Sequence, residues 1–265
     1  KAGLKVGDII LEVDNIDASG LTGDELTKLI RGKEGTKVRL LVKSNDLKKS
    51  IILKRDKIEV QTVYSEVLEY KEHKIGYLNL IYFAANTSSQ FESEIKKLEK
   101  KEIKSLIIDV RDNPGGHLLQ VREILSMFFD KKTVLYQIES KNNKKKIYSL
   151  NNSKKTYPLV ILINKKSASA SEILASSIQD NYKNSLIIGE NSYGKGTVQK
   201  SKNLSDGTSI KFTTQKWLTA KGVWLNKKGV KPDIEVKLDE NYFKNPTQEN
   251  DSQLQEALKR IIELL

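Results

Sequence analysis

Beyond residue 57, short apolar runs of strand length alternate with charged segments, and these charged segments have apolar residues at helical spacing. Each run is rich in Leu, Ile and Val, as in a strand that is buried within a sheet. The charged segments place apolar residues three and four positions apart, as in a helix with one buried face. This alternation predicts an α/β core with helices packed on the faces of a sheet. The expected strands lie at 75–82, 105–110, 133–138, 158–164 and 185–189.

The two ends of the chain follow other patterns. Residues 1–57 combine alternating strands with one helix over 23–31, so we expect a small β-rich domain there. The main domain then covers 58–240. Residues 241–265 are expected to form a linker and a C-terminal helix that packs on the core or on a partner. The polar composition that indicates the linker covers residues 240–251. The apolar face of that helix carries Leu254, Leu258, Ile261 and Leu265.

Composition excludes several classes of protein. No run of 18 apolar residues is present, so we expect a membrane to be reached only through a segment upstream of Lys1. The absence of cysteine excludes disulfides and thiolate metal sites. The net charge of +12 arises from lysines scattered along every segment, with few aromatic residues between them. This distribution favours a solvated surface over a specific nucleic-acid site, although weak attraction to anionic surfaces is expected.

A serine-rich turn before an expected helix is the first candidate for chemistry. Ser167, Ser169 and Ser171 alternate there, and Ser169 stands three residues before Glu172, which also fits a helix capping box. A serine at a helix start lies near free backbone amides and partial positive charge, so the same residue can be a cap and a nucleophile. The spacing alone does not choose among the three serines.

A nucleophilic serine needs a base, and two candidates are available. His117 follows a double glycine and would need Asp112 or Asp109 to orient it. Lys195 lies between two glycines after an apolar run, and an apolar environment favours the neutral amine that a base requires. Gln199, four residues further on, can orient this amine without forming an ion pair. We therefore favour Lys195.

Backbone amides near the serine are candidate donors to an oxyanion. The sequence Asn113-Pro114-Gly115-Gly116 follows an expected buried strand, where ligands of α/β sheets usually bind. Glycines allow amides to point into a pocket, so the amides of Gly115 or Gly116 and of Ala170 are expected to form an oxyanion hole. The same four residues also describe an ordinary turn.

The first domain resembles part of a bacterial PDZ domain. The segments KAGLKVGDIILEVD and LIRGKEGTKVRLLV match the C-terminal two-thirds of that family, so the PDZ domain is N-terminally truncated here. The loop that binds a terminal carboxylate in the family lies upstream of this sequence. The resemblance implies binding of an extended peptide beside the helix. Leu26 and Ile30 then line the peptide groove, or else belong to the domain core.

The remaining motifs resemble the carboxyl-terminal processing proteases, also called tail-specific proteases. The matching segments are IGYLNL, LIIDVRDNPGG, KSASASEILASSIQD, LIIGENSYGKGTVQ and GVKPDIEV, in the order of the family. The resemblance implies a serine endopeptidase with Ser169 as nucleophile, Lys195 as base and Gln199 as its support. The loop at 181–185 is one residue longer than the family pattern, which weakens any assignment made by counting.

The same resemblance carries further expectations. It implies a ClpP/crotonase-like ββα spiral core, no metal, no cofactor, and protein or peptide substrates recognised through apolar C-terminal tails. The PDZ domain would gate activity, with Arg31 as a possible link to the core. It also implies export to the cell envelope and allows a homo-oligomer. A non-catalytic peptide-binding scaffold on the same fold is the alternative.

Overall fold

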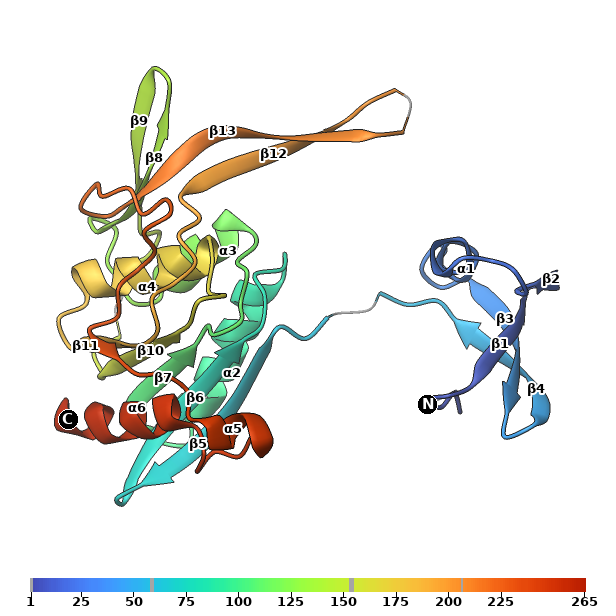
Figure 1. The fold of residues 1–265 in the computed structure, drawn as a ribbon, viewed down its shortest axis with the longest axis horizontal. Coiled ribbons are helices and arrows are strands. Elements are labelled where there is room, and N and C mark those ends of the chain that lie inside the picture. Colours follow the sequence, from blue (N-terminus) through green and yellow to red (C-terminus); the bar gives the residue numbers. More distant parts are fainter. Residues whose placement is uncertain (1, 58–59, 153–154, 206) are drawn as a thin grey trace. The chain divides into compact units, whose positions relative to one another are not determined.

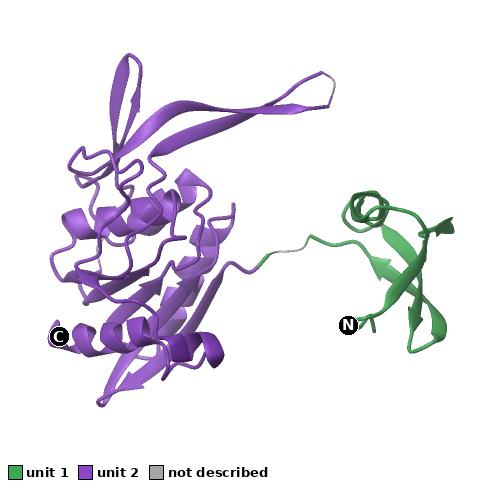
Figure 2. Ribbon diagram, viewed as in Figure 1, with its two compact units in different colours: residues 1–60 green, residues 61–265 purple. Residues whose placement is uncertain are grey.

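A computed structural model describes residues 2–57, 60–152, 155–205 and 207–265, which form two compact units. Figure 2 shows the smaller unit, residues 1–60, and the larger unit, residues 61–265. The boundary expected between 57 and 58 touches Ile58 and Glu59, which lie outside the described residues. No helix among the described residues has the length and apolar character needed to cross a bilayer.

The smaller unit is a four-stranded antiparallel sheet with one helix. Its core is formed by alternate residues of the strands, chiefly Val38, Leu40 and Val42. The helix begins with the expected capping box, in which Glu25 accepts from the Thr22 amide at 2.9 Å. The strands have the order β2-β1-β3-β4, and the elements are β1 (Ile9–Val13), β2 (Ile16–Asp17), α1 (Gly23–Ile30), β3 (Lys37–Ser44) and β4 (Leu47–Lys54).

A six-stranded sheet forms the centre of the larger unit. Its order is β14-β11-β10-β7-β6-β5, and all neighbours are parallel except β5 and β6. The inner parallel strands β7, β10 and β11 are largely apolar because helices cover both sides of the sheet. The strands are β5 (Val63–Tyr70), β6 (His73–Leu80), β7 (Ser105–Asp109), β10 (Leu159–Ile163), β11 (Ser185–Gly189) and β14 (Ile234–Glu235).

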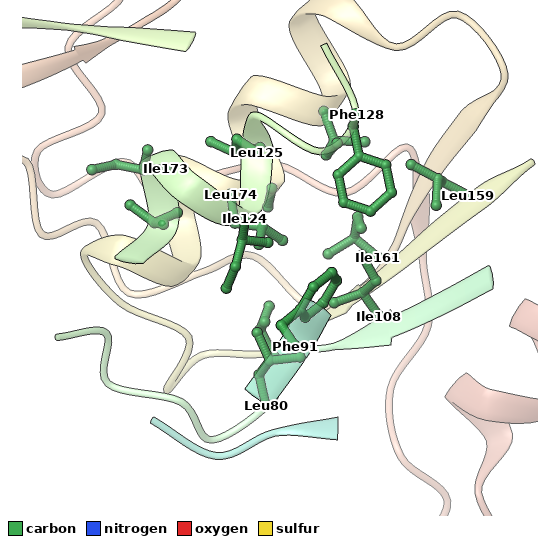
Figure 3. Close-up of a cluster of buried hydrophobic side chains, with 14 of the residues drawn as sticks. Leu80, Phe91, Ile108, Ile124, Leu125, Phe128, Leu159, Ile161, Ile173 and Leu174 are labelled. Atoms are coloured by element: carbon green, nitrogen blue, oxygen red, sulfur yellow. The ribbon is translucent and has the colours of Figure 1, made fainter. Parts of the chain in front are cut away.

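Two apolar layers hold helices against this sheet. One layer, drawn in Figure 3, joins the strands to three helices, with Phe91, Ile124 and Ile173 among its buried residues. These helices are α2 (Thr87–Glu99), α3 (Leu118–Leu125) and α4 (Ala170–Asn181). The opposite layer joins Ile107 and neighbours to α6 (Ser252–Glu263), so α6 and α4 lie on opposite sides of the sheet (Figure 1). The predicted α/β architecture is confirmed.

A second, smaller sheet was not foreseen. It has the antiparallel order β12-β13-β8-β9, and the long β12–β13 hairpin projects from the larger unit (Figure 1). The expected strand at 133–138 belongs to this sheet and not to the central one. Its strands are β8 (Val134–Ser140), β9 (Asn143–Tyr148), β12 (Thr197–Asn203) and β13 (Ser209–Thr219).

The C-terminal region differs from the expectation in two details. Residues 240–251 were expected to be a linker, but the short helix α5 (Glu240–Lys244) lies within them, capped by the Asp239 side chain. Helix α6 packs on the sheet through Leu254, Leu258 and Ile261, whereas Leu265 lies beyond the helix and is exposed. The helical stripe of the sequence therefore extends one turn further than the buried face.

Candidate active site

Ser169 occupies the junction between strand β10 and helix α4. Its backbone has φ 57° and ψ −112°, a conformation that non-glycine residues rarely adopt. Such a backbone costs on the order of 1–3 kcal/mol and is found chiefly where function requires a particular side-chain direction. The junction lies at the carboxyl end of a parallel strand, the usual position of sites in α/β sheets.

The hydrogen bonds distinguish the three serines that the sequence left equivalent. The buried Ser167 hydroxyl donates to Val110 O at 2.7 Å, and the buried Ser171 hydroxyl donates to Asn113 O at 2.9 Å. Ser167 therefore holds the turn before α4, and Ser171 the first turn of α4, against the segment that follows β7. Ser169 is partly exposed and lines a cavity. Of the three, Ser169 is the serine available to a substrate.

Glu172 holds the two halves of the candidate site together, a role that the sequence did not reveal. Its carboxylate is fully buried and accepts four hydrogen bonds. One oxygen accepts from the amides of Ser169 and Lys195 at 2.8 and 2.9 Å. The other accepts from Gly194 N and from the Ser192 hydroxyl, both at 2.6 Å. One side chain thus fixes the backbone of the serine and the backbone of the lysine.

Lys195 lies in the turn between β11 and β12 and is half-buried. Its carbonyl accepts from Trp217 Nε1 at 2.7 Å, so a fully buried indole anchors the turn. In the described parts of the chain, no carboxylate forms an ion pair with its ammonium group. A lysine without a carboxylate partner is better suited to become a neutral base. Gln199 follows on β12 and lines the same cavities as Lys195.

The glycine loop lies directly against the start of helix α4. A Cβ atom on Gly115 would come within 2.6 Å of Ala168 O and 2.8 Å of Ala170 N, so only glycine fits there. The Gly115 amide is already used, because it donates to Asn113 Oδ1 at 2.9 Å. Among the described residues, no acceptor faces the amides of Gly116 or Ala170. Of the three expected oxyanion donors, these two are therefore free.

His117 shares the cavity with Ser169 but lacks the partner that a triad needs. Asp109 binds Arg111 and Tyr77. Asp112 forms an ion pair with Lys166 at 3.2 Å and accepts from the Asn164 side chain. Neither of these two carboxylates contacts the imidazole, so neither orients His117 as a triad requires.

Two cavities flank Lys195. The first has a volume of about 620 Å³ and is lined by Ser169, Lys195 and Gln199 together with the loop around Gly116. The second, of about 650 Å³, lies beside Tyr193 and shares Lys195 and Gln199 with the first. Both volumes are typical of ligand-binding sites. No group of three or more histidine and carboxylate side chains suited to a metal ion occurs in the described part of the chain.

A buried ion pair fixes the strand end from which the glycine loop starts. Arg111 donates to Asp109 at 2.6 Å and to Asp251, the N-cap of α6, at 2.8 Å. Burial, together with the Asp109 charge, raises the pKa of the adjoining Tyr77 phenol above its usual value. The sequence contains no local signal for the contact between Arg111 and Asp251, because these two residues are 140 positions apart.

Comparison with known families decides which class this site belongs to. Residues 74–236 match the model of peptidase family S41, and residues 1–44 match the PDZ domain model. The first match covers well over half of the chain and includes Ser169 and Lys195. The chain belongs to peptidase family S41. The expected relation to the carboxyl-terminal processing proteases is confirmed by relatives that carry this name.

Several S41 relatives are similar over most of the chain. Carboxy-terminal processing protease CtpB of Bacillus subtilis is 38% identical over 98% of the chain and 53% of the relative. CtpA of the same organism is 40% identical over 93% of the chain and 52% of the relative. The structure of a photosystem II D1 C-terminal processing protease is 29% identical, with a TM-score of 0.61, and covers 89% of this chain and 64% of that one. This chain thus spans about half the length of its curated relatives.

The residues expected to bind peptide lie in the smaller unit. Leu26 and Ile30 are half-buried and pack against the core of that unit. They therefore contribute to the core while keeping part of their surface exposed. Arg31 follows as the exposed C-cap of α1, where its amide donates to Thr27 O.

Proposed function

We propose that this S41 chain is a serine endopeptidase with Ser169 as nucleophile, Lys195 as general base and Gln199 as a support for the amine. One observation carries the proposal: the partly exposed Ser169, with its unusual backbone, lines the same cavity as Lys195, which forms no ion pair with any carboxylate of the described residues. The free amides of Gly116 and Ala170 lie beside this serine and suit a developing oxyanion. Glu172 keeps the serine and lysine backbones in register.

The reaction is an acyl transfer in two steps. The Ser169 oxygen attacks the peptide carbonyl carbon, and its proton passes to the neutral amine of Lys195. The amides of Gly116 and Ala170 stabilise the negative carbonyl oxygen. The carbon–nitrogen bond breaks, and the Lys195 ammonium gives its proton to the leaving amine. Water, deprotonated by the same amine, then attacks the ester at Ser169. The carbon–oxygen bond breaks, and the Lys195 ammonium returns its proton to the Ser169 oxygen.

The smaller unit is proposed to capture the substrate tail. A PDZ domain binds an extended C-terminal segment beside its helix, so Leu26 and Ile30 would contact an apolar tail. Capture raises the local concentration of substrate at the cleavage site. Two substrates that differ only in an apolar or a doubly acidic tail test this step. The apolar tail is expected to give the lower KM, and equal KM values would contradict tail capture.

Three further parts of the proposal concern the whole protein. Arg31 is proposed to link the smaller unit to the protease core, and replacement by alanine is expected to change kcat without changing tail affinity. Export to the cell envelope and association into homo-oligomers are also proposed, on the family resemblance alone. Fractionation of cells and the mass of the protein in solution test these two parts. A protein that remains inside the cell, or is strictly monomeric, would contradict them.

Ser169→Ala tests the proposed nucleophile most simply. We expect cleavage of an unfolded protein with an apolar tail to fall by at least about a thousandfold. The free energy of unfolding should fall by no more than about 2 kcal/mol, because Ser169 is only partly buried and the main loss is its capping of α4. Ser89→Ala, at an exposed serine of α2, is the matched control and should retain full activity.

The same assay separates the enzyme from its alternative. If the protein is a peptide-binding scaffold, the unsubstituted protein, Ser169→Ala and Ser89→Ala should all bind the tail, and none of them should cleave the substrate. Full activity of Ser169→Ala would instead assign catalysis to another residue. Either result contradicts the proposal.

A further inference from the structure

Strand β12 is a free sheet edge beside the candidate active site. It begins at Thr197, two residues after Lys195, and pairs with β13 on one side only. Within the described residues, no other strand pairs with its second side. Figure 1 shows β12 and β13 leaving the body of the larger unit together. An exposed edge presents unpaired backbone N–H and C=O groups to any extended chain that approaches it.

The ladder with β13 determines which residues turn these groups outward. Near the active site, Trp217 N donates to Gly196 O at 3.1 Å, and at the far end Leu204 N donates to Thr208 O at 2.8 Å. Hydrogen-bonded and non-hydrogen-bonded pairs alternate along an antiparallel ladder. Counting along the ladder from Gly196 shows that the backbone N–H and C=O of Thr197 point away from β13. Counting back from Leu204 shows the same for Ser201 and Gln199. The two counts meet at the bulge between Val198 and Gln199.

These outward residues border the cavity that contains Ser169. Thr197, Gln199 and Ser201 line it from the β12 side, and the segment from Gly116 to the start of α3 at Leu118 and Leu119 lines it from the other. The side chains of these three β12 residues are uncharged, unlike the neighbouring lysines at 200 and 202, which alternate with them. Natural sheet edges are commonly guarded by charge or covered, and this one is left accessible where it borders the site.

The opposite wall supplies apolar surface for side chains. Leu118 is half-buried and Leu119 is exposed at the start of α3, and both line the cavity. A bound strand directs its side chains alternately to either face, so alternate residues can reach this wall while the backbone bonds to β12. The cavity volume of about 620 Å³ accommodates a few residues of extended chain.

We propose that the substrate segment around the scissile bond binds as an added strand on the free edge of β12, through the backbone of Thr197, Gln199 and Ser201. This inference rests on the proposed function, because it places the added strand beside Ser169. Backbone pairing accepts many side-chain sequences but requires an extended, unfolded segment. The substrate class is therefore unfolded polypeptide without proline at the positions that pair with β12.

Ser201 allows the backbone contribution to be separated from that of the side chain. Ser201→Pro removes one outward N–H, and proline is tolerated at such edge positions. Ser201→Ala keeps the N–H and is the matched control. Both changes are introduced into the Ser169→Ala protein, and the dissociation constant of a fluorescent, uncleaved substrate peptide is measured. We expect Ser201→Pro to weaken binding about five- to tenfold and Ser201→Ala to change it less than about twofold.

A second measurement does not depend on the fold of any β12 variant. Peptides methylated at one backbone nitrogen at a time are titrated into the Ser169→Ala protein. Weakened binding at alternate positions supports strand addition, because only every second N–H of an added strand faces β12. Equal binding of the two Ser201 variants, or a methylation effect without alternation, would overturn the inference. Cleavage by Ser169→Ala would overturn the proposed catalytic function instead, and it appears separately as product.

Discussion

At the scale of single residues, Glu172 connects the candidate nucleophile to the candidate base. Its buried carboxylate accepts from two backbone amides in the lysine turn, one at the serine, and the Ser192 hydroxyl. Since displacement by about 1 Å can reduce a rate about a hundredfold, this connection matters for rate as well as stability. Glu172 does not contact the cavity and acts through the backbones that it holds.

Glu172→Gln is expected to impair both folding and catalysis. Each carboxylate oxygen of Glu172 accepts from two buried donors. Glutamine replaces one of these oxygens by an NH2 group, which cannot accept, so two buried donors lose their acceptor. We expect a loss of about 2–4 kcal/mol in the free energy of unfolding, measured in urea, and a fall in kcat of at least about tenfold under conditions where the variant is folded.

Glu190→Gln provides the matched control. Glu190 forms an ion pair at 3.0 Å with the exposed Lys165, and surface pairs of this kind contribute about 0–1 kcal/mol. The control should keep its kcat and most of its stability. If Glu172→Gln behaves like this control, the proposed positioning role is wrong.

How far the sequence predicts the site depends on the range of the contacts involved. The local motifs brought forward Ser169, Lys195 and the glycine loop. They could not separate Ser169 from Ser167 and Ser171, because the distinguishing acceptors lie about 57 positions away. They also could not show that Asn113 occupies the Gly115 amide. The roles assigned to Ser169, Lys195 and Gln199 stay predictions until they are measured.

At the scale of elements, helix α4 is fixed at both ends. Its first turn carries Glu172, and Tyr182 at its C-cap donates to the carbonyls of Tyr157 and Lys155 at 2.7 and 3.0 Å. The ring of Tyr182 makes edge contacts with Phe128 and Phe129. Burial raises the pKa of Tyr182 to about 12, because the charged phenolate is poorly solvated there.

This raised pKa predicts how stability changes at alkaline pH. In the unfolded chain a tyrosine loses its proton near pH ~10, whereas Tyr182 in the folded protein retains it to about pH 12. The contribution of the protonated Tyr182 to the free energy of unfolding is complete below pH ~10. It is lost as the pH rises toward 12, because the tyrosine of the unfolded chain releases its proton first. The free energy of unfolding of Tyr182→Phe, measured in urea, should therefore decline less steeply between pH ~10 and 12 than that of the unsubstituted protein.

The exposed Tyr64 provides a control for this experiment. Tyr64→Phe should follow the unsubstituted protein throughout the alkaline range. Identical slopes for Tyr182→Phe and the unsubstituted protein would contradict the assignment.

The elements themselves were predictable to different degrees. The central strands β6, β7, β10 and β11 and the helices around them follow from apolar periodicity, because these segments are buried on one or both faces. Strands β5, β13 and β14 were not predicted. Strands β9 and β12 escaped prediction because they are largely exposed and lysine-rich, so burial leaves no pattern in their sequence. Their position depends on pairing with β8 and β13. The segment that borders the candidate site most closely was therefore the least visible in the sequence.

At the scale of the whole molecule, two compact units are assigned different tasks. The smaller unit matches the PDZ model and is proposed to bind tails, while the larger unit carries the candidate catalytic residues. The positive charge of the chain comes from lysines distributed over both units, and it favours encounters with acidic surfaces without specifying one. Selection among substrates is thus proposed to come from the tail and from the extended backbone at β12.

The central claim is that the amine of Lys195 is the base for Ser169, and a cysteine-free chain allows it to be tested by chemical repair. Lys195→Cys introduces a single thiol, and alkylation with 2-bromoethylamine converts it into a close analogue of lysine. We expect Lys195→Cys to lose at least about a thousandfold in kcat/KM. Alkylation should restore a substantial part of it, whereas iodoacetamide treatment should restore none. Full activity of unmodified Lys195→Cys, or equal recovery with both reagents, would contradict the account.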